Sequence, residues 1–267
     1  MVNDDFSVAS AVRSRGDGRF EANLPDGWQQ GRGAFGGLVL GALARALMAS
    51  EDDAARTLRA LTGEVFGPVQ PGIADVEVRA LRRGNGMSTW EAWLSQGGEV
   101  RARATTILGR SRAVDTDAVE LTAPDVGGPW HAVAVAPIAP PFGPAFADHV
   151  EFRPRGVAPF SSAWRSGAEG WVRFKRTVPL GMPELVALAD AYWPARFARE
   201  AGPRPMATVA FTFEPLVDPA TLDPAEPLYH RATSPASSGG HAVELRELWT
   251  ARGELVALNQ QTFAVIR

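Results

Sequence analysis

A single carboxylate, Asp190, stands in an otherwise apolar segment that is predicted to form a helix. At helical spacing it would share a face with Val186, Trp193 and Phe197. A carboxylate on an apolar face is costly unless it is hydrogen-bonded, and burial there raises its pKa above the usual value of about 3.9. Two interpretations remain open: a buried carboxylate with a chemical role, or an aspartate that is exposed or paired with Arg196.

Gln261 is a second candidate, because it lies in phase with the apolar residues of the last predicted strand. Those residues are Leu255, Ala257, Phe263 and Val265. A buried glutamine must satisfy its amide, so a structural role between strands is the alternative to a chemical one. Gln260 is adjacent, and a slip of one residue would exchange the two side chains.

Thr208 opens the predicted strand MATVAFTF. It alternates with Ala210 and Thr212, whereas the residues between them, such as Val209 and Phe211, form the more apolar set. Periodicity alone therefore predicts that Thr208 points away from the apolar face. On periodicity alone, a strand threonine is far more often an ordinary strand residue than a functional one.

The stretch from Gly31 to Ala49, GRGAFGGLVLGALARALMA, combines glycines with a helix that is apolar on almost every side. Such a helix must be buried. Gly36 and Gly37 at its start would let a ligand approach backbone N–H groups that carry about half a positive charge, which suits an oxyanion. The alternative is tight packing of the helix inside a sheet. The spacing GxGxxG also occurs here, but no apolar strand precedes it, so a dinucleotide site is rejected.

The rest of the chain reads as strands joined by tight turns, with a second helix and one irregular region. Residues 111–147 contain six prolines and little periodicity, and they read as a linker over the surface. The first predicted helix begins at Gly36 and ends near Ser50 to Asp53, and the second covers 182–198. The predicted strands cover 6–12, 19–22, 74–81, 88–94, 100–108, 148–154, 171–178, 206–213, 227–234, 240–249 and 253–266.

The order of elements before the linker is repeated after it, which predicts a tandem repeat of one fold. The hairpin GGEVRARATT (97–106) can be overlaid on RGELVALNQQ (252–261), which sets Gln261 opposite Thr106. FGPV (66–69) is similarly overlaid on FEPL (213–216). In the first helix the place of Asp190 falls near Leu43, so the fold itself does not require a carboxylate there. The expected domains are 1–110, the linker 111–147, and 148–267.

A long buried helix wrapped by a curved antiparallel sheet, present twice, resembles the double hotdog fold, an α+β architecture, of the type II acyl-CoA thioesterase family. The likeness rests on GAFGGLVLGALARAL in the first half and on ALADAYW, MATVAF and GELVALNQQTFAVIR in the second. The resemblance implies that Asp190, Thr208 and Gln261 hold the water that attacks a thioester, with backbone N–H groups at Gly36 or Gly37, or their counterparts in the other half, as oxyanion donors.

The same resemblance implies an acyl thioester as the small-molecule substrate, with coenzyme A entering as part of the substrate and no other cofactor. It also implies homodimers or higher homo-oligomers. The alternative function is a catalytically silent hotdog protein that binds acyl-CoA as a sensor or scaffold.

Composition and charge argue against nucleic-acid-binding, metal-binding and membrane proteins. The chain has 267 residues, a formal net charge of −3 and no clustered basic run, which argues against nucleic acid as a partner. It contains no cysteine, and its four histidines show no metal-ligand spacing, so we expect no metal site. No stretch reaches the roughly 20 apolar residues of a membrane helix, and the N-terminus does not resemble a signal peptide. We therefore expect a cytoplasmic protein without a membrane partner.

Overall fold

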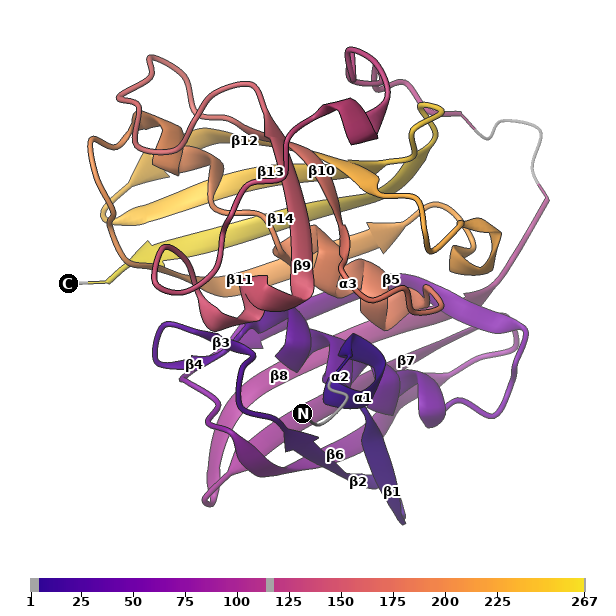
Figure 1. Ribbon diagram of the computed structural model, residues 1–267. Coiled ribbons are helices and arrows are strands. Elements are labelled where there is room, and N and C mark those ends of the chain that lie inside the picture. Colours follow the sequence, from indigo (N-terminus) through magenta and orange to yellow (C-terminus); the bar gives the residue numbers. More distant parts are fainter. Residues whose placement is uncertain (1–4, 114–117, 267) are drawn as a thin grey trace.

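A computed structural model describes residues 5–113 and 118–266 (Figure 1). Each half contains two strands, a buried helix and four further strands, in that order. In the first half these are β1 (Val12–Gly16), β2 (Arg19–Leu24), α2 (Gly36–Ala49), β5 (Arg56–Val65), β6 (Gly72–Arg83), β7 (Met87–Gln96) and β8 (Glu99–Arg110). In the second half they are β9 (Val150–Arg155), β10 (Ala168–Phe174), α3 (Met182–Asp190), β11 (Met206–Pro215), β12 (Leu228–Ser238), β13 (His241–Trp249) and β14 (Leu255–Val265).

Shorter elements connect these units. They are α1 (Phe6–Ala9), the two-residue strands β3 (Gln29–Gln30) and β4 (Gly33–Ala34), and the 3-10 helices η1 (Trp130–Ala132), η2 (Ala145–His149), η3 (Ala195–Arg199) and η4 (Pro219–Thr221).

The twelve long strands form one antiparallel sheet in the order β1-β2-β6-β7-β8-β5-β11-β14-β13-β12-β10-β9. The order in the second half mirrors that in the first, and the halves join where β5 pairs with β11, for example Phe211 with Gly63. Figure 1 shows the sheet curving around the helices of each half. The predicted double hotdog, with two tandem repeats of a helix wrapped by an antiparallel sheet, is confirmed.

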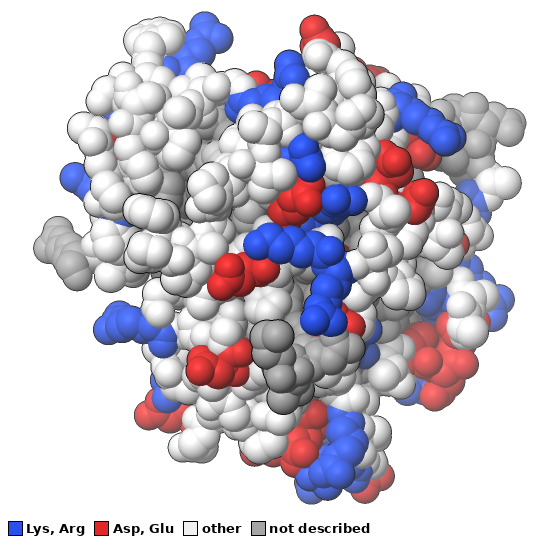
Figure 2. Space-filling model, viewed as in Figure 1, with Lys and Arg blue, Asp and Glu red and all other residues white. Residues whose placement is uncertain are grey.

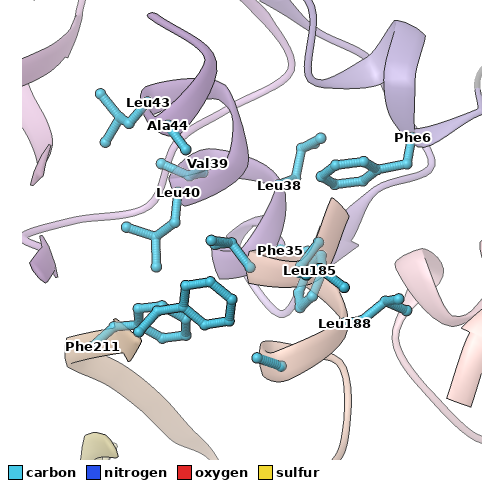
Figure 3. Packing of buried hydrophobic residues seen from close by; sticks show 14 of the residues in the cluster. Phe6, Phe35, Leu38, Val39, Leu40, Leu43, Ala44, Leu185, Leu188 and Phe211 are labelled. Carbon is cyan, nitrogen blue, oxygen red and sulfur yellow. The ribbon is translucent and has the colours of Figure 1, made fainter. Parts of the chain in front are cut away.

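The two long helices pack against each other in the centre of the molecule and run in opposite directions. A Cβ on Gly37 would lie 2.8 Å from the Cα of Ala187, and a Cβ on Gly41 would lie 3.3 Å from the carbonyl oxygen of Pro183. Glycines therefore permit this close crossing. Leu40 and Leu43 of α2 are fully buried, as predicted for a helix that is apolar all round (Figure 3).

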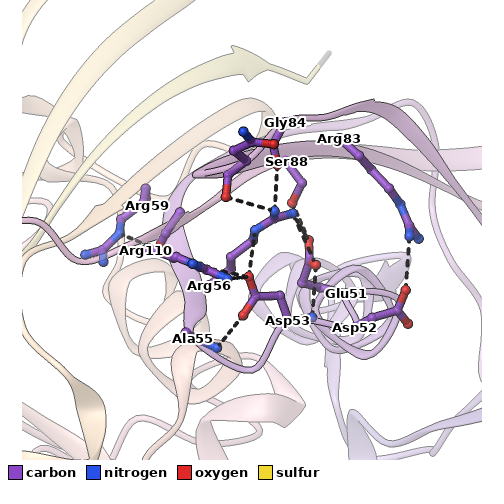
Figure 4. Close-up of polar contacts among 12 residues, drawn as sticks. Glu51, Asp52, Asp53, Ala55, Arg56, Arg59, Arg83, Gly84, Ser88 and Arg110 are labelled. Atoms are coloured by element: carbon purple, nitrogen blue, oxygen red, sulfur yellow. Dashed lines mark hydrogen bonds and ion pairs between the residues drawn. The ribbon is translucent and has the colours of Figure 1, made fainter.

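The turn after α2 is anchored to the sheet by a polar cluster (Figure 4). Glu51 accepts hydrogen bonds from the Ser88 hydroxyl and from Trp90 Nε1, the latter at 3.1 Å. Burial opposes ionisation of Glu51, but these bonds and Arg56 outweigh it and lower its pKa to about 2. The end of the helix is thus held to β7 by hydrogen bonds to a carboxylate whose ionised form is favoured.

One predicted segment is wrong near the N-terminus. Residues 6–9 form α1 rather than the start of a strand, because the Asp5 side chain accepts a hydrogen bond from the Val8 N–H and caps a helical turn. Within the glycine-rich stretch the helix begins at Gly36, as predicted, and Gly33 and Ala34 before it pair with Gln29 and Gln30 in a small hairpin.

The second helix is shorter than predicted: α3 ends at Asp190 instead of continuing to residue 198. Pro194 cannot continue a helix and disfavours helical geometry in the residue before it. Trp193 and Phe197 consequently do not share a helical face with Asp190. After a turn, the chain resumes as the separate 3-10 helix η3.

One of the two repeat overlays is also wrong. The Phe66 N–H bonds to the Arg101 carbonyl, and the Leu216 N–H bonds to the Val256 carbonyl at the corresponding point of the second half. Phe66 therefore corresponds to Leu216, not to Phe213, and the overlay of FGPV on FEPL is displaced. The hairpin overlay is correct, because Thr106 pairs with Leu61 as Gln261 pairs with Phe211.

The segment between the halves packs on the outer face of the second half of the sheet. Val126, Trp130 and Val133 contact a buried cluster formed by Trp171, Tyr229, Trp249 and Leu255. Residues 114–117 of the predicted linker, and Arg267 of the predicted second domain, lie outside the described residues. The domain limits at residues 110 and 148 stay a prediction.

In Figure 2 acidic and basic side chains are interspersed over the visible face. No helix among the described residues has the length and apolar character needed to cross a bilayer.

Candidate functional site

The structure brings Asp190, Thr208 and Gln261 together in one hydrogen-bonded chain at the centre of the molecule. Gln261 Nε2 donates to Asp190 Oδ1 at 3.0 Å, and the Thr208 hydroxyl donates to Gln261 Oε1 at 3.0 Å. The three residues come from α3, β11 and β14. The amide is thereby oriented, with its nitrogen toward the carboxylate and its oxygen toward the hydroxyl.

A β-bulge places Thr208 in this chain. Thr208 pairs with Phe263 and Ala210 pairs with Thr262, so Val209 is the extra residue. The extra residue resets the alternation, and Thr208 reaches the same face as Phe211, which pairs with Gln261. The prediction from strict alternation, that Thr208 points away from the apolar face, is wrong for this reason.

Gln261, not Gln260, faces the interior. Gln261 is fully buried, whereas Gln260 is exposed and pairs with Leu245 on the neighbouring strand. Gln261 Nε2 also donates to Asn259 Oδ1 at 2.9 Å, which satisfies its second amide hydrogen. Asn259 was not among the predicted site residues, although its position in phase with Gln261 along β14 could have indicated it.

Gly36 and Gly37 bring the N-terminus of α2 against Asp190. A Cβ on Gly36 would lie 2.9 Å from Asp190 Oδ2, so a larger residue would press on the carboxylate. The cap residue Phe35 has no side-chain hydrogen bond, and the first turn of α2 contains no acidic residue. The carboxylate from the other half of the molecule therefore lies where the positive end of the helix favours an anion. Tight packing, the alternative interpretation of the glycines, is shown for Gly37, since a Cβ there would lie 2.8 Å from the Cα of Ala187. The oxyanion role of the two glycines stays a prediction.

A buried ion pair between Arg246 and Glu244 holds the backbone around Asp190 in place. Arg246 Nε donates to Glu244 Oε1 at 2.7 Å, and both side chains are 1% exposed. Arg246 also donates to the carbonyl oxygens of Ala189, Asp190 and Tyr192 at 2.9, 3.1 and 3.2 Å. These contacts satisfy the free carbonyls at the end of α3 and fix where the helix stops.

The remaining oxygen of Glu244 accepts a hydrogen bond from the Ala195 N–H at 2.7 Å, which secures the start of η3. Neither Glu244 nor Arg246 was predicted. Their signal was present in GHAVELRELW, where both charges alternate in phase with the buried Ala242 and Leu248.

The environment of Asp190 opposes its ionisation. Its burial raises the pKa, while the Arg246 charge, the Gln261 amide and the Gly37 backbone N–H act in the opposite direction. Arg196, the alternative partner considered from the sequence, instead pairs with Glu200 at 3.0 Å. Gly36, next to the carboxylate, and Thr208, at the far end of the hydrogen-bonded chain, are only partly buried. A buried carboxylate with a raised pKa, linked through an amide to a hydroxyl and placed at a helix N-terminus, has the properties that general-base chemistry requires.

The equivalent place in the first half carries none of these groups. Counted from the start of each helix, Asp190 corresponds to Ala44, which is fully buried in the core. β5 has a bulge that corresponds to the bulge of β11, and the residue before it is Leu58 where β11 has Thr208. On the neighbouring strand, Thr106 takes the place of Gln261. The expectation that the fold does not require a carboxylate in the first helix is correct, and the adjacent residue Leu43 is fully buried as well.

The comparisons with known proteins agree with this architecture. The family model of the acyl-CoA thioesterase N-terminal domain matches residues 24–109, and the family model of the acyl-CoA thioesterase C-terminal domain matches residues 119–265. No curated protein matches the chain.

Solved structures share the fold over nearly the whole length. A protein of unknown function with a hot dog fold from Alicyclobacillus acidocaldarius is 25% identical, with a TM-score of 0.89 over 98% of each chain. Acyl-CoA thioesterase II from Mycobacterium marinum is 17% identical, with a TM-score of 0.78 over 98% of each chain. Because the C-terminal domain alone spans more than half of the residues, this chain belongs to the acyl-CoA thioesterase family.

Proposed function

We propose that this protein hydrolyses an acyl-CoA or acyl-carrier thioester to a free acid and a thiol, with Asp190 as general base. The observation that carries the proposal is the Asp190–Gln261–Thr208 chain in the second half, set at the N-terminus of the first helix. The first half shows that the fold is built without these groups. Membership of the acyl-CoA thioesterase family supports the same reaction class.

In the proposed reaction Asp190 accepts a proton from water while the water oxygen attacks the thioester carbonyl carbon. Thr208 and Gln261 position the water next to the carboxylate. The water attacks directly, so the reaction requires no covalent enzyme intermediate. The tetrahedral oxyanion then collapses, the C–S bond breaks, and the thiolate leaves and takes up the proton.

The oxyanion would be stabilised by a backbone N–H at the positive end of α2. The Gly37 N–H already acts on the Asp190 carboxylate, so we assign the oxyanion role to Gly36 first. Gly36 also stands in the more open position of the two, since it is only partly buried.

Release of free thiol from a panel of acyl-CoA esters of increasing chain length tests this function directly. Steady turnover by the wild-type protein is expected. Binding of the same esters without turnover would instead favour the sensor or scaffold alternative.

An assembly of two or more chains is also proposed, and light scattering that returned a monomer near 28.5 kDa at micromolar concentration would contradict it.

A further inference from the structure

A polar hollow of about 290 Å³ lies on the surface of the second half, between η3 and the end of β12. It is separate from the three residues of the candidate site. Its lining combines arginines and serine hydroxyls with a short stretch of strand backbone: Ser166, Arg196, Arg199, Ser234, Pro235, Ala236 and Ser237.

One wall of the hollow is a β-bulge in β12. Thr233 pairs with Leu245 and Ala236 pairs with Val243, so Ser234 and Pro235 leave the regular ladder. Pro235 has no N–H to donate, which suits this position. The Ser166 hydroxyl donates to the Ser234 carbonyl at 2.8 Å and accepts from the Ser234 N–H at 3.0 Å. The wall is thus held in a defined shape.

The facing wall carries two positive charges from η3. Arg196 donates to the Ser237 hydroxyl at 2.7 Å and pairs with Glu200 at 3.0 Å, so its guanidinium is held toward the hollow. Arg199 is exposed and also lines the hollow. Two arginines against one adjacent carboxylate leave an excess of positive charge beside hydroxyl groups. Arginine with hydroxyl donors is the arrangement that binds phosphate groups in proteins.

The hollow is connected to the candidate site through short polar contacts. The N–H of Ala195, at the start of η3, donates to Glu244, which pairs with Arg246, and Arg246 donates to the Asp190 carbonyl. In the second half, residues 191–205 join the helix to the next strand, whereas residues 50–55 suffice in the first half. The segment that carries η3 and its arginines is therefore not required by the fold.

We propose that this hollow binds a phosphate of the pantetheine carrier to which the acyl group is attached. The proposal rests on the proposed thioester hydrolysis and extends it to carrier recognition. Phosphate groups of such carriers are separated from the sulfur by the long pantetheine arm, so they must bind outside the catalytic centre. An arginine-lined surface hollow next to η3 meets that requirement.

Three substrates with the same acyl chain test the proposal: the thioesters of coenzyme A, of 4′-phosphopantetheine and of pantetheine. Arg199→Gln, at an exposed position, and Arg196→Gln are each expected to raise KM for a phosphorylated carrier about tenfold, as for a lost charge-assisted hydrogen bond, with kcat kept. The pantetheine thioester, which has no phosphate, should change by less than about twofold on this reasoning. Arg82→Gln, an exposed arginine of β6, is the matched control.

The pattern of loss identifies the phosphate. A loss with the coenzyme A thioester alone assigns the hollow to the nucleotide phosphates, and a loss with 4′-phosphopantetheine as well assigns it to the phosphate next to the arm. Unchanged KM values in both arginine variants, or an equal loss with the pantetheine thioester, would overturn the proposal. If the wild-type protein hydrolysed none of the substrates, the proposed function would fail, and calorimetric binding of coenzyme A to the same variants would still test the hollow.

Discussion

Replacement of Asp190 by asparagine is the sharpest test of the proposed chemistry. The substitution keeps the size of the side chain and an oxygen that can accept the hydrogen bond from Gln261 Nε2, which is 3.0 Å from Asp190 Oδ1 in the wild-type protein. It removes the property that the mechanism requires of this side chain, the ability to take a proton from water. The expected loss in kcat is therefore that of a general base, about 10²–10⁴-fold, or ~2.7–5.4 kcal/mol of transition-state stabilisation.

Asp190→Asn should lower kcat but should not lower the stability of the folded protein. Burial raises the pKa of Asp190 above 3.8, so the stability linked to its proton is fully present below the unfolded pKa and is lost as pH rises through the folded pKa. At neutral pH the ionised carboxylate thus costs about 1.4 kcal/mol for each unit by which its pKa is raised. Asparagine carries no charge and avoids this cost. Asp190→Asn should unfold at the wild-type temperature or a few degrees above it.

The measurements are thiol release over a range of pH and a thermal melt of each variant. In the wild-type protein kcat/KM should fall on the acid side with an apparent pKa above 3.8, because only the ionised carboxylate acts as a base. Asp75→Asn, the same chemical change at an exposed position of β6, serves as the control. Turnover within about threefold of wild type in folded Asp190→Asn would refute the assignment of the base, since general-base loss is at least about a hundredfold.

Three further substitutions test the groups around the carboxylate. Gln261→Ala should reduce turnover about 10–100-fold by removing a hydrogen bond to a charged group, while Gln260→Ala at the exposed neighbour should have little effect; equal thiol release by both variants would contradict the site. Gly36→Ala sets a Cβ 2.9 Å from the carboxylate and should lower kcat without lowering the melting temperature, whereas Gly37→Ala meets the backbone of α3 at 2.8 Å and should lower both. Arg246→Met removes the charge that most opposes the raised pKa of the base, so the acid limb of the pH–rate profile should move to higher pH, and urea melts should show a loss of about 3–5 kcal/mol because its buried glutamate partner is left unpaired. An unmoved acid limb would count against that arginine as a positioning residue.

Local patterns in the sequence were sufficient to predict most elements of the fold. The stretch that became α2 is apolar on almost every side, and a buried helix satisfies that pattern. The repeated order of strands and helix predicted the tandem halves, and the hairpin overlay correctly set Gln261 opposite Thr106. Asp190 and Gln261 could be predicted as site residues because each is a polar residue at a position that the helix or strand period assigns to the apolar face.

Other features depended on contacts between residues far apart in the chain. Strict alternation placed Thr208 on the wrong face, because a bulge at Val209 depends on how β11 pairs with β14. The end of α3 is set by Pro194, which is visible in the sequence, together with Arg246, whose bonds to helix carbonyls are not.

The joining of the site was decided only by the tertiary structure. Asp190 lies in one repeat and Gly36 in the other, and they meet because glycines let two antiparallel helices cross closely. Each residue type carried its own chemistry in the sequence, namely a carboxylate, an amide, a hydroxyl and an unhindered N–H. Their mutual distances arise from strand pairing and helix packing, which are properties of the folded chain and leave no periodic trace along it.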